Sequence, residues 1–144
     1  MPNPWLSVLN LITLMSSELV GFGNIMNIEL IREYCLRKGF VTEEIPFNED
    51  SPVYKVLGKI FLIASLDQPI SINLKCHPEK AIELREEYDC VKPGYHMNKM
   101  HWNTVIIDNS VSDKLIYEWI DHSFDLVVKN LKKKDREKIL SFKD

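Results

Sequence analysis

The segment from Gly94 to Thr104, GYHMNKMHWNT, gathers more unlike polar and aromatic side chains than any other part of the chain. It carries a phenol, two imidazoles, two amides, an ammonium group and an indole, supplied by Tyr95, His96, His101, Asn98, Asn103, Lys99 and Trp102. Such groups can hydrogen-bond, stack on rings and neutralise anions at one surface. The segment is therefore the first candidate for a functional site.

Ligand spacing tests whether this segment could hold zinc. His96 and His101 stand five positions apart, a separation at which one loop can present both imidazoles to a metal. Cys76 and Cys90 are too widely spaced to form a second pair of that kind, although an upstream histidine and aspartate could replace them. We favour surface or half-buried histidines, and the sequence predicts neither a metal nor a cofactor.

Nucleophilic catalysis would need a thiolate near a base and an orienting amide, and Cys76, His101 and Asn103 supply these residue types. However, Cys76 falls on the apolar face of a predicted strand, where a thiol is normally inert. The acidic residues between positions 43 and 50 have no acid–base partner that the sequence can place. We assign no catalytic residue and expect a protein without enzymatic activity; an unrecognised enzyme is the less favoured alternative.

Anion binding suits the segment better, because lysines fall in it and in the neighbouring predicted strands, at Lys55, Lys59, Lys75, Lys92 and Lys99. If one face collects them, they could follow a phosphate backbone, with the two amides contacting bases or phosphates and the rings of Tyr95 and Trp102 stacking on bases. Lysines on the outer face of a sheet are also ordinary solubility and edge-protection devices. The net charge of −3 and pI of about 5.8 exclude a strongly basic nucleic-acid binder and leave room for a local basic patch.

Helical periodicity and capping signals predict four helices. Asn27 caps the first, which Gly39 ends, and Pro78 opens the second, whose inward residues include Ile82. Ser110, with Asp113 three residues later, predicts the start of a long third helix. The predicted ranges are 27–38, 78–88, from 110 onward, and 132–138.

Strand patterns complete the predicted fold. Residues 53–57 and 60–65 form a hairpin around Gly58 and Lys59, strict alternation marks residues 70–76 with Lys75 facing away from the core, and residues 102–107 form a further strand. One helix, an antiparallel run of strands, then a helix, a strand and helices make one α+β domain over residues 26–144, with an antiparallel sheet packed against helices. Its three cysteines suit reduced thiols in the cytoplasm.

Residues 1–25 differ in composition, since they lack Lys and Arg and contain one acidic residue. Polar residues interrupt their apolar stretch, so neither a membrane span nor a signal peptide is expected. Three interpretations stay open: a short amphipathic helix packed on the domain, an apolar tail, or a natural start at Met26. We favour the last, because Asn27 then caps a helix almost at once.

The chain resembles the MmcQ/YjbR family of small bacterial proteins, commonly labelled DNA-binding. The resemblance rests on GYHMNKMHWNT and extends to KVLGKIF at 55–61, NLKCHPE at 73–79, LREEY at 84–88 and IDHSFDLVV at 120–128. It covers residues 26–131 approximately. The chain departs from the family pattern at Leu57, where glycine is frequent, at Met100, where a second lysine is usual, and at Phe124, where tyrosine is common.

This resemblance implies a CyaY-like (frataxin-like) α+β fold, with a double-wing arrangement of sheet and loops for DNA contact. Motif positions carried over to this sequence imply a surface made of Lys55, Lys59, Lys75, His96, Asn98, Lys99, His101 and Asn103. The leading hypothesis is therefore a cytoplasmic DNA-binding module of modest affinity, plausibly monomeric. One alternative is that GYHMNKMHWNT lines a pocket for a small anionic ligand or a substrate. Another is that the segment is structural and the protein binds a protein partner elsewhere.

Overall fold

The computed structural model describes residues 26–46, 49–95 and 97–143. The interpretations of residues 1–25 and the expectation for His96 lie outside these described residues. None of the helices in the described ranges is long and apolar enough to cross a membrane.

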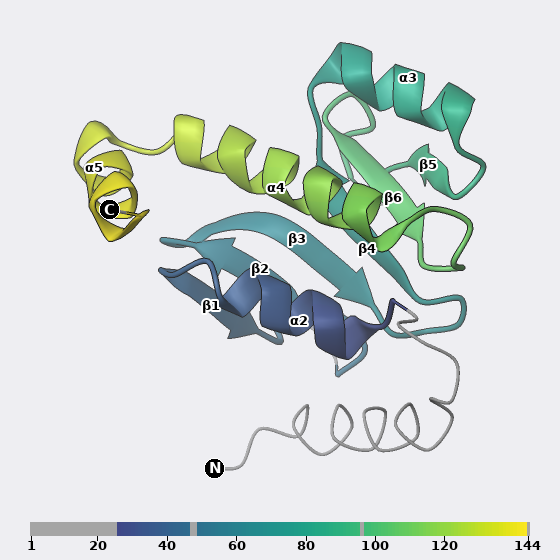
Figure 1. Cartoon of the computed structure of the whole chain (residues 1–144), viewed down its shortest axis with the longest axis horizontal. Coiled ribbons are helices and arrows are strands. Elements are labelled where there is room, and N and C mark those ends of the chain that lie inside the picture. Colours follow the sequence, from purple (N-terminus) through teal and green to yellow (C-terminus); the bar gives the residue numbers. More distant parts are fainter. Residues whose placement is uncertain (1–25, 47–48, 96, 144) are drawn as a thin grey trace.

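A six-stranded sheet forms the centre of the fold (Figure 1), with its strands in the order β1-β2-β3-β4-β6-β5 and every neighbouring pair antiparallel. The strands are β1 (Val41–Glu44), β2 (Val53–Val56), β3 (Lys59–Ser65), β4 (Ser71–Lys75), β5 (Val91–Pro93) and β6 (Trp102–Ile106). The predicted α+β class, with an antiparallel sheet packed against helices, is confirmed.

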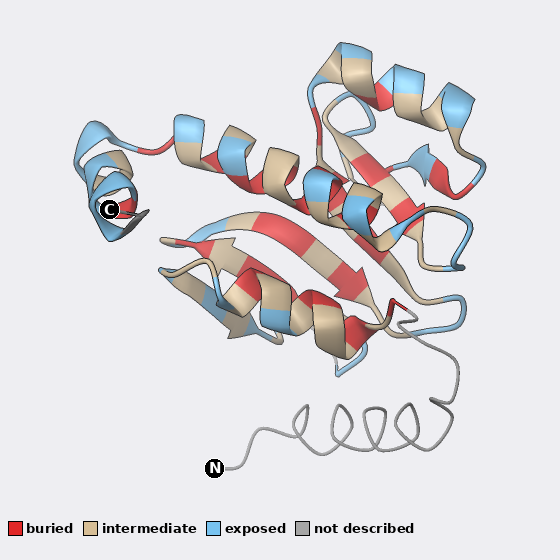
Figure 2. Ribbon diagram, in the orientation of Figure 1, coloured by how far each residue is buried: buried red, intermediate tan, exposed pale blue. Residues whose placement is uncertain are grey.

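The helices are α2 (Ile28–Leu36), α3 (Pro78–Glu87), α4 (Asp113–Lys129) and α5 (Lys133–Lys143). In Figure 1, α2 and α4 run over the sheet, α3 lies beside β5 and β6, and α5 follows the far end of α4. Buried residues line the sides of the strands and helices that face each other (Figure 2). Tyr54, Phe61 and Ile120 in this core are fully buried, so removing apolar surface from water stabilises the layered arrangement.

Local signals in the sequence set the ends of several elements as predicted. The Asn27 side chain accepts a hydrogen bond from Leu30 N–H at 2.9 Å and caps α2. Gly39 follows the helix with φ of +81°, which suits glycine. In β4, buried Ile72 and Leu74 alternate with half-buried Asn73 and Lys75, as the pattern of period two predicted.

Three local expectations need correction. The hairpin turn is formed by Leu57 and Gly58, with φ of +45° and +84°, because Lys59 already pairs with Val56 in the ladder. Helix α4 begins two residues later than predicted, since Ser112 supplies the cap by accepting from Leu115 N–H. Ile82 was expected to face inward but is 54% exposed, because α3 covers only the β5–β6 edge of the sheet.

A bulge in β3 lies where Ser123 of α4 contacts the sheet. Tyr54 pairs with Leu62 whereas Lys55 pairs with Ile60, so Phe61 is an extra residue in β3. The fully buried Ser123 hydroxyl of α4 accepts from Lys75 N–H at 2.8 Å and donates to Phe61 C=O at 2.5 Å. One helix side chain thus bridges the backbones of β3 and β4 at the point where β4 ends.

Candidate functional site

Three chain segments that are far apart in the sequence meet around one cavity of about 340 Å³. We call it the motif cavity, because most of its lining comes from the NLKCHPE, GYHMNKMHWNT and IDHSFDLVV segments. Its lining residues are Lys75, Cys76, His77, Pro78, Asn98, His101, Trp102, Leu126 and Asn130. Four of the residues singled out in the sequence as a binding surface therefore meet here: Lys75, Asn98, His101 and Trp102.

The pairing of β4 with β6 determines the shape of the motif cavity. Lys75, the last residue of β4, lies opposite Trp102, the first residue of β6. Just beyond the ladder, Cys76 N–H donates to His101 C=O at 2.7 Å. Pro78 then starts α3, so His77 lies in a two-residue connection beside the cavity. The C-terminal half of α4 supplies Leu126 to the opposite wall.

Arg85 of α3 holds the loop that carries Asn98 and His101. Its guanidinium donates to Asn103 Oδ1 at 2.7 Å and to Trp102 C=O at 3.3 Å, and it also bonds Lys99 C=O. Within the loop, Asn98 Oδ1 accepts from the N–H of Met100 at 2.9 Å. These bonds preorganise the loop, because a guanidinium presents several donors in a fixed plane.

Asn103 does not lie on the surface, contrary to expectation. Its side chain is 2% exposed, accepts from Arg85 and donates to Ala81 C=O at 3.4 Å. In β6 it shares the helix-covered face with Val105, because side chains of a strand alternate between faces. Asn103 therefore ties β6 to α3, and its amide is not available to a bound partner.

The other predicted residues divide into two groups. Lys75, Asn98, His101 and Trp102 line the motif cavity, and the exposed Lys99 lies in the same loop, with Nζ 3.4 Å from Gly94 C=O. Tyr95 in this loop is 70% exposed. By contrast, Lys55 lies on β2, where its ammonium is 2.5 Å from the Glu44 carboxylate, and Lys59 is exposed at the hairpin. The lysines do not all gather at one place.

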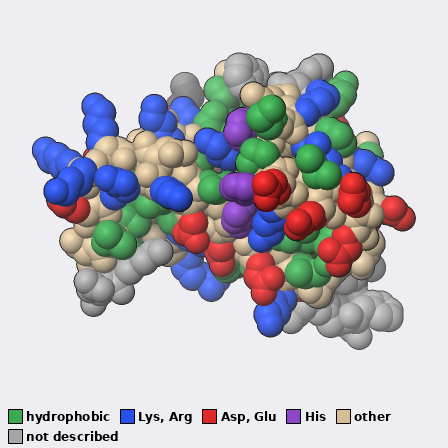
Figure 3. All heavy atoms as spheres, turned by 90° about the horizontal axis from the view of Figure 1, so that it is seen from above, with side chains coloured by type: hydrophobic (Ala, Val, Ile, Leu, Met, Phe, Trp, Pro, Cys, Tyr) green, Lys and Arg blue, Asp and Glu red, His purple; other side chains and the backbone are tan. Residues whose placement is uncertain are grey.

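Positive and titratable groups surround the motif cavity. Figure 3 shows histidine side chains gathered near the middle of the face seen from above, with Lys or Arg and also Asp or Glu side chains beside them. His122 accepts from His77 N–H at 3.2 Å through Nε2. Burial lowers the pKa of His122, the Lys80 ammonium lowers it further, and Asp125 opposes both. The hydrogen bond from His77 N–H needs the neutral imidazole, since a protonated one has no acceptor nitrogen.

The cysteine and metal hypotheses gain no support from the described geometry. Burial raises the pKa of the Cys76 thiol, more than the nearby Lys80 and Arg85 lower it, and this disfavours the reactive thiolate. Within residues 26–46, 49–95 and 97–143, no group of three or more His, Cys, Asp or Glu side chains could hold a metal ion.

Four residues that build the site were not assigned to it from residue types: Arg85, His122 and Ser123 were not singled out, and His77 was considered only as a substitute zinc ligand. All four lie in segments on which the family resemblance rests, NLKCHPE, LREEY and IDHSFDLVV. Their presence in those motifs was the signal that could have identified them. Motif membership does not predict which residues contact one another.

Comparison with known proteins gives consistent matches. The family model described as YjbR matches residues 36–126. The uncharacterized protein YbdF of Escherichia coli O157:H7 is 37% identical over 112 residues, which are 77% of this chain and 92% of YbdF. The uncharacterized protein YjbR of Escherichia coli K12 is 31% identical, over 80% of this chain and 98% of that protein. The crystal structure of Deinococcus radiodurans protein DR2400, a DUF419 domain, is similar with a TM-score of 0.74 and 32% identity, covering 80% of this chain and 88% of that one.

Proposed function

This chain belongs to the YjbR family, as its resemblance had indicated, and we propose that it binds DNA with modest affinity and without catalysing a reaction. The observation that carries the proposal is the convergence of three motif segments on the motif cavity, which places Lys75 beside His77 and His101. A cavity at which an ammonium group and imidazoles meet suits a phosphate group.

Donors around the motif cavity match what a backbone phosphate needs. Lys75 offers a charge, and the amide nitrogen of Asn98 can donate because its Oδ1 already accepts from Met100 N–H. The half-buried ring of Trp102 offers a surface on which a base can stack. Lys99 and Tyr95 in the same loop can extend this contact along the strand.

Lysines farther away would lengthen the contact surface. In their strands, Lys55 and Lys75 each alternate with buried residues that face the helices. The side chains of both lysines therefore leave the strand on the opposite face of the sheet. Lys55 would contribute less than Lys75, because its ion pair with Glu44 must be broken first. In this proposal the protein has a frataxin-like fold and contacts DNA through the double-wing arrangement of sheet and loops that the resemblance implies. It acts as a monomer in the cytoplasm.

The proposal is tested by titrating labelled duplex and single-stranded DNA with the protein at several salt concentrations. Wild-type affinity should fall steeply with salt, and Lys75→Gln should lower affinity uniformly across sequences and reduce the logarithmic salt slope by about 1. Lys114→Gln, which removes an exposed lysine at the other end of α4, is the matched control and should change neither quantity. Absence of salt-sensitive binding even at low salt would rule the proposal out.

A second candidate function is binding of a small anionic ligand, and the concave form of the motif cavity favours it. Inorganic phosphate and a mononucleotide should then bind, and His101→Gln and Lys75→Gln should weaken both. Nuclear magnetic resonance titration separates the two candidates: mononucleotide binding at the cavity without any DNA binding supports the small ligand. Binding of both supports DNA with the cavity as its phosphate site.

A further inference from the structure

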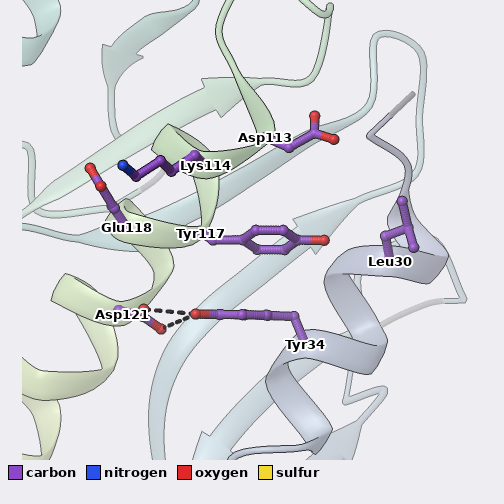
Figure 4. A pocket seen from close by; sticks show the side chains of 7 residues that line it. All are labelled: Leu30, Tyr34, Asp113, Lys114, Tyr117, Glu118 and Asp121. Atoms are coloured by element: carbon purple, nitrogen blue, oxygen red, sulfur yellow. Dashed lines mark hydrogen bonds between the residues drawn. The ribbon is translucent and has the colours of Figure 1, made fainter. Parts of the chain in front are cut away.

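A second concave site lies between α2 and α4, away from the motif cavity (Figure 4). It has a volume of about 610 Å³ and is lined by Leu30, Tyr34, Asp113, Lys114, Tyr117, Glu118 and Asp121. We call it the tyrosine groove. Its lining carries three carboxylates against one ammonium group, together with two aromatic rings and an aliphatic side chain.

The tyrosine groove is built as a ladder of facing residues. On α2 the positions 30, 34 and 38 follow one another at intervals of four, as do positions 113, 117 and 121 on α4, so each set lies along one side of its helix. Position 38 lies just beyond the end of α2. The rings of Tyr34 and Tyr117 stack with centroids 4.2 Å apart and form the middle rung.

At one end of this ladder lies the ammonium group of Lys38, a residue of the same chain. Lys38 forms an ion pair with Asp121, and its ammonium lies 4.8 Å from the centroid of the Tyr34 ring. Tyr34 also donates to the Asp121 carboxylate, at 2.7 and 2.8 Å from its two oxygens. A cation held between a carboxylate and an aromatic face combines ion pairing with the attraction of the ring quadrupole.

The other end has the carboxylate and the ring, and the ammonium of Lys114, the cation of the lining, is directed away from it toward Glu118 (Figure 4). By the same register Asp113 faces Leu30, an aliphatic residue at the position equivalent to Lys38. Within the described part of the chain, no ion pair or side-chain hydrogen bond engages the Asp113 carboxylate. Figure 4 shows Leu30, Tyr117 and Asp113 around the same space.

Burial and the Asp113 carboxylate both affect the pKa of the neighbouring Tyr117 hydroxyl. Burial raises the pKa of the Tyr117 hydroxyl, the Asp113 carboxylate is the next cause of the increase, and the Arg37 guanidinium acts in the opposite direction. The other two charged residues of the lining, Lys114 and Glu118, lie together on the far side of Tyr117 from Leu30 (Figure 4). The open end of the ladder thus matches a guest that brings a positive charge and a short alkyl chain to lie on Leu30.

We propose that the tyrosine groove binds an alkylammonium ion, whose charge lies between the Asp113 carboxylate and the Tyr117 ring while its methylene groups contact Leu30. The guest reproduces at this end what Lys38 does at the other. The site is independent of the proposed DNA surface, because it shares no lining residue with the motif cavity.

Isothermal titration calorimetry of the full chain at low ionic strength tests the site with two probes. Putrescine represents a free amine, and N-acetyl-lysine methylamide represents the lysine side chain of a protein; the tighter probe identifies the source. Asp113→Asn should weaken binding at least fivefold through loss of the ion pair. The matched control Glu83→Gln removes an exposed carboxylate from α3, outside the groove, and should leave affinity unchanged.

Leu30→Lys is the sharper variant, because it supplies the missing ammonium from within the chain. It should abolish binding of both probes, whereas Leu30→Met, which keeps an apolar side chain, should bind as the wild type does. Thermal unfolding of each variant confirms that it is folded before its affinity is compared. Failure of both probes to bind the wild type would overturn the proposal, as would wild-type affinity in Asp113→Asn and Leu30→Lys.

Discussion

Ser123→Ala tests whether one buried hydroxyl stabilises the sheet where β4 ends beside the bulge of β3. The substitution removes a single oxygen and leaves Lys75 N–H and Phe61 C=O without the partner that bridges them. Ser123 is fully buried, so water cannot replace the hydroxyl. The substitution therefore leaves two buried backbone groups without a hydrogen-bond partner.

The expected magnitude follows from those two groups. Leaving one buried donor or acceptor unpaired costs about 1 to 3 kcal/mol, so two cost about 2 to 6 kcal/mol if nothing rearranges. Local rearrangement of β3 and β4 would recover some of this, and we expect a loss of about 3 kcal/mol. For a domain of this size the melting temperature should fall by roughly 10 °C.

Urea unfolding followed by circular dichroism measures the change in the free energy of unfolding. Ser141→Ala is the matched control, since Ser141 is exposed and donates to Glu137 C=O at 2.9 Å on α5, and it should alter stability by less than about 0.5 kcal/mol. If Ser123→Ala is as mild as this control, the bridging role assigned to Ser123 is wrong.

Two further predictions concern the hairpin and the pH dependence of stability. Leu57→Asn should stabilise the protein by about 1 kcal/mol, because Asn tolerates the φ of +45° in the turn before Gly58 better than Leu does; a lower urea midpoint would show that the packing of Leu57 outweighs backbone strain. Burial and Lys80 lower the pKa of His122 from its ordinary value of 6.5, so the unfolded chain binds more protons than the folded chain near that pH. Stability should therefore be complete above about pH 6.5 and fall as the pH decreases below it. Urea midpoints between pH 5 and 8 measure this dependence, which His122→Asn should flatten; an unchanged profile in that variant would assign the effect to another group.

Sequence patterns predicted those elements whose formation depends on interactions between residues close in the chain. The alternation of Ile72 and Leu74 with polar neighbours predicted β4, and the Asn27 cap predicted the start of α2, because both depend on residues close in the chain. Strand β5 was missed because it contains only three residues, Val91–Pro93, and acquires its strand character by pairing with β6.

The candidate site was only partly accessible to sequence reasoning. The polar segment from Gly94 to Thr104 was singled out because unlike side chains collect there, and its residues Asn98, His101 and Trp102 line the motif cavity with Lys75. Alternation along a strand does not show which face of the sheet the helices cover. The burial of the Asn103 side chain therefore became known only from the packing of α3 against β6.

The family, the α+β class and the residue types available for binding could all be inferred from the order of the amino acids. The tertiary structure decided which of those residues meet. Antiparallel pairing of β4 with β6 joins Lys75 to Trp102, and packing of α4 on the sheet carries Ser123 to the bulge at Phe61. These contacts join residues separated by tens of positions in the chain, and such pairings depend on the order of strands and on side-chain packing that no local pattern encodes.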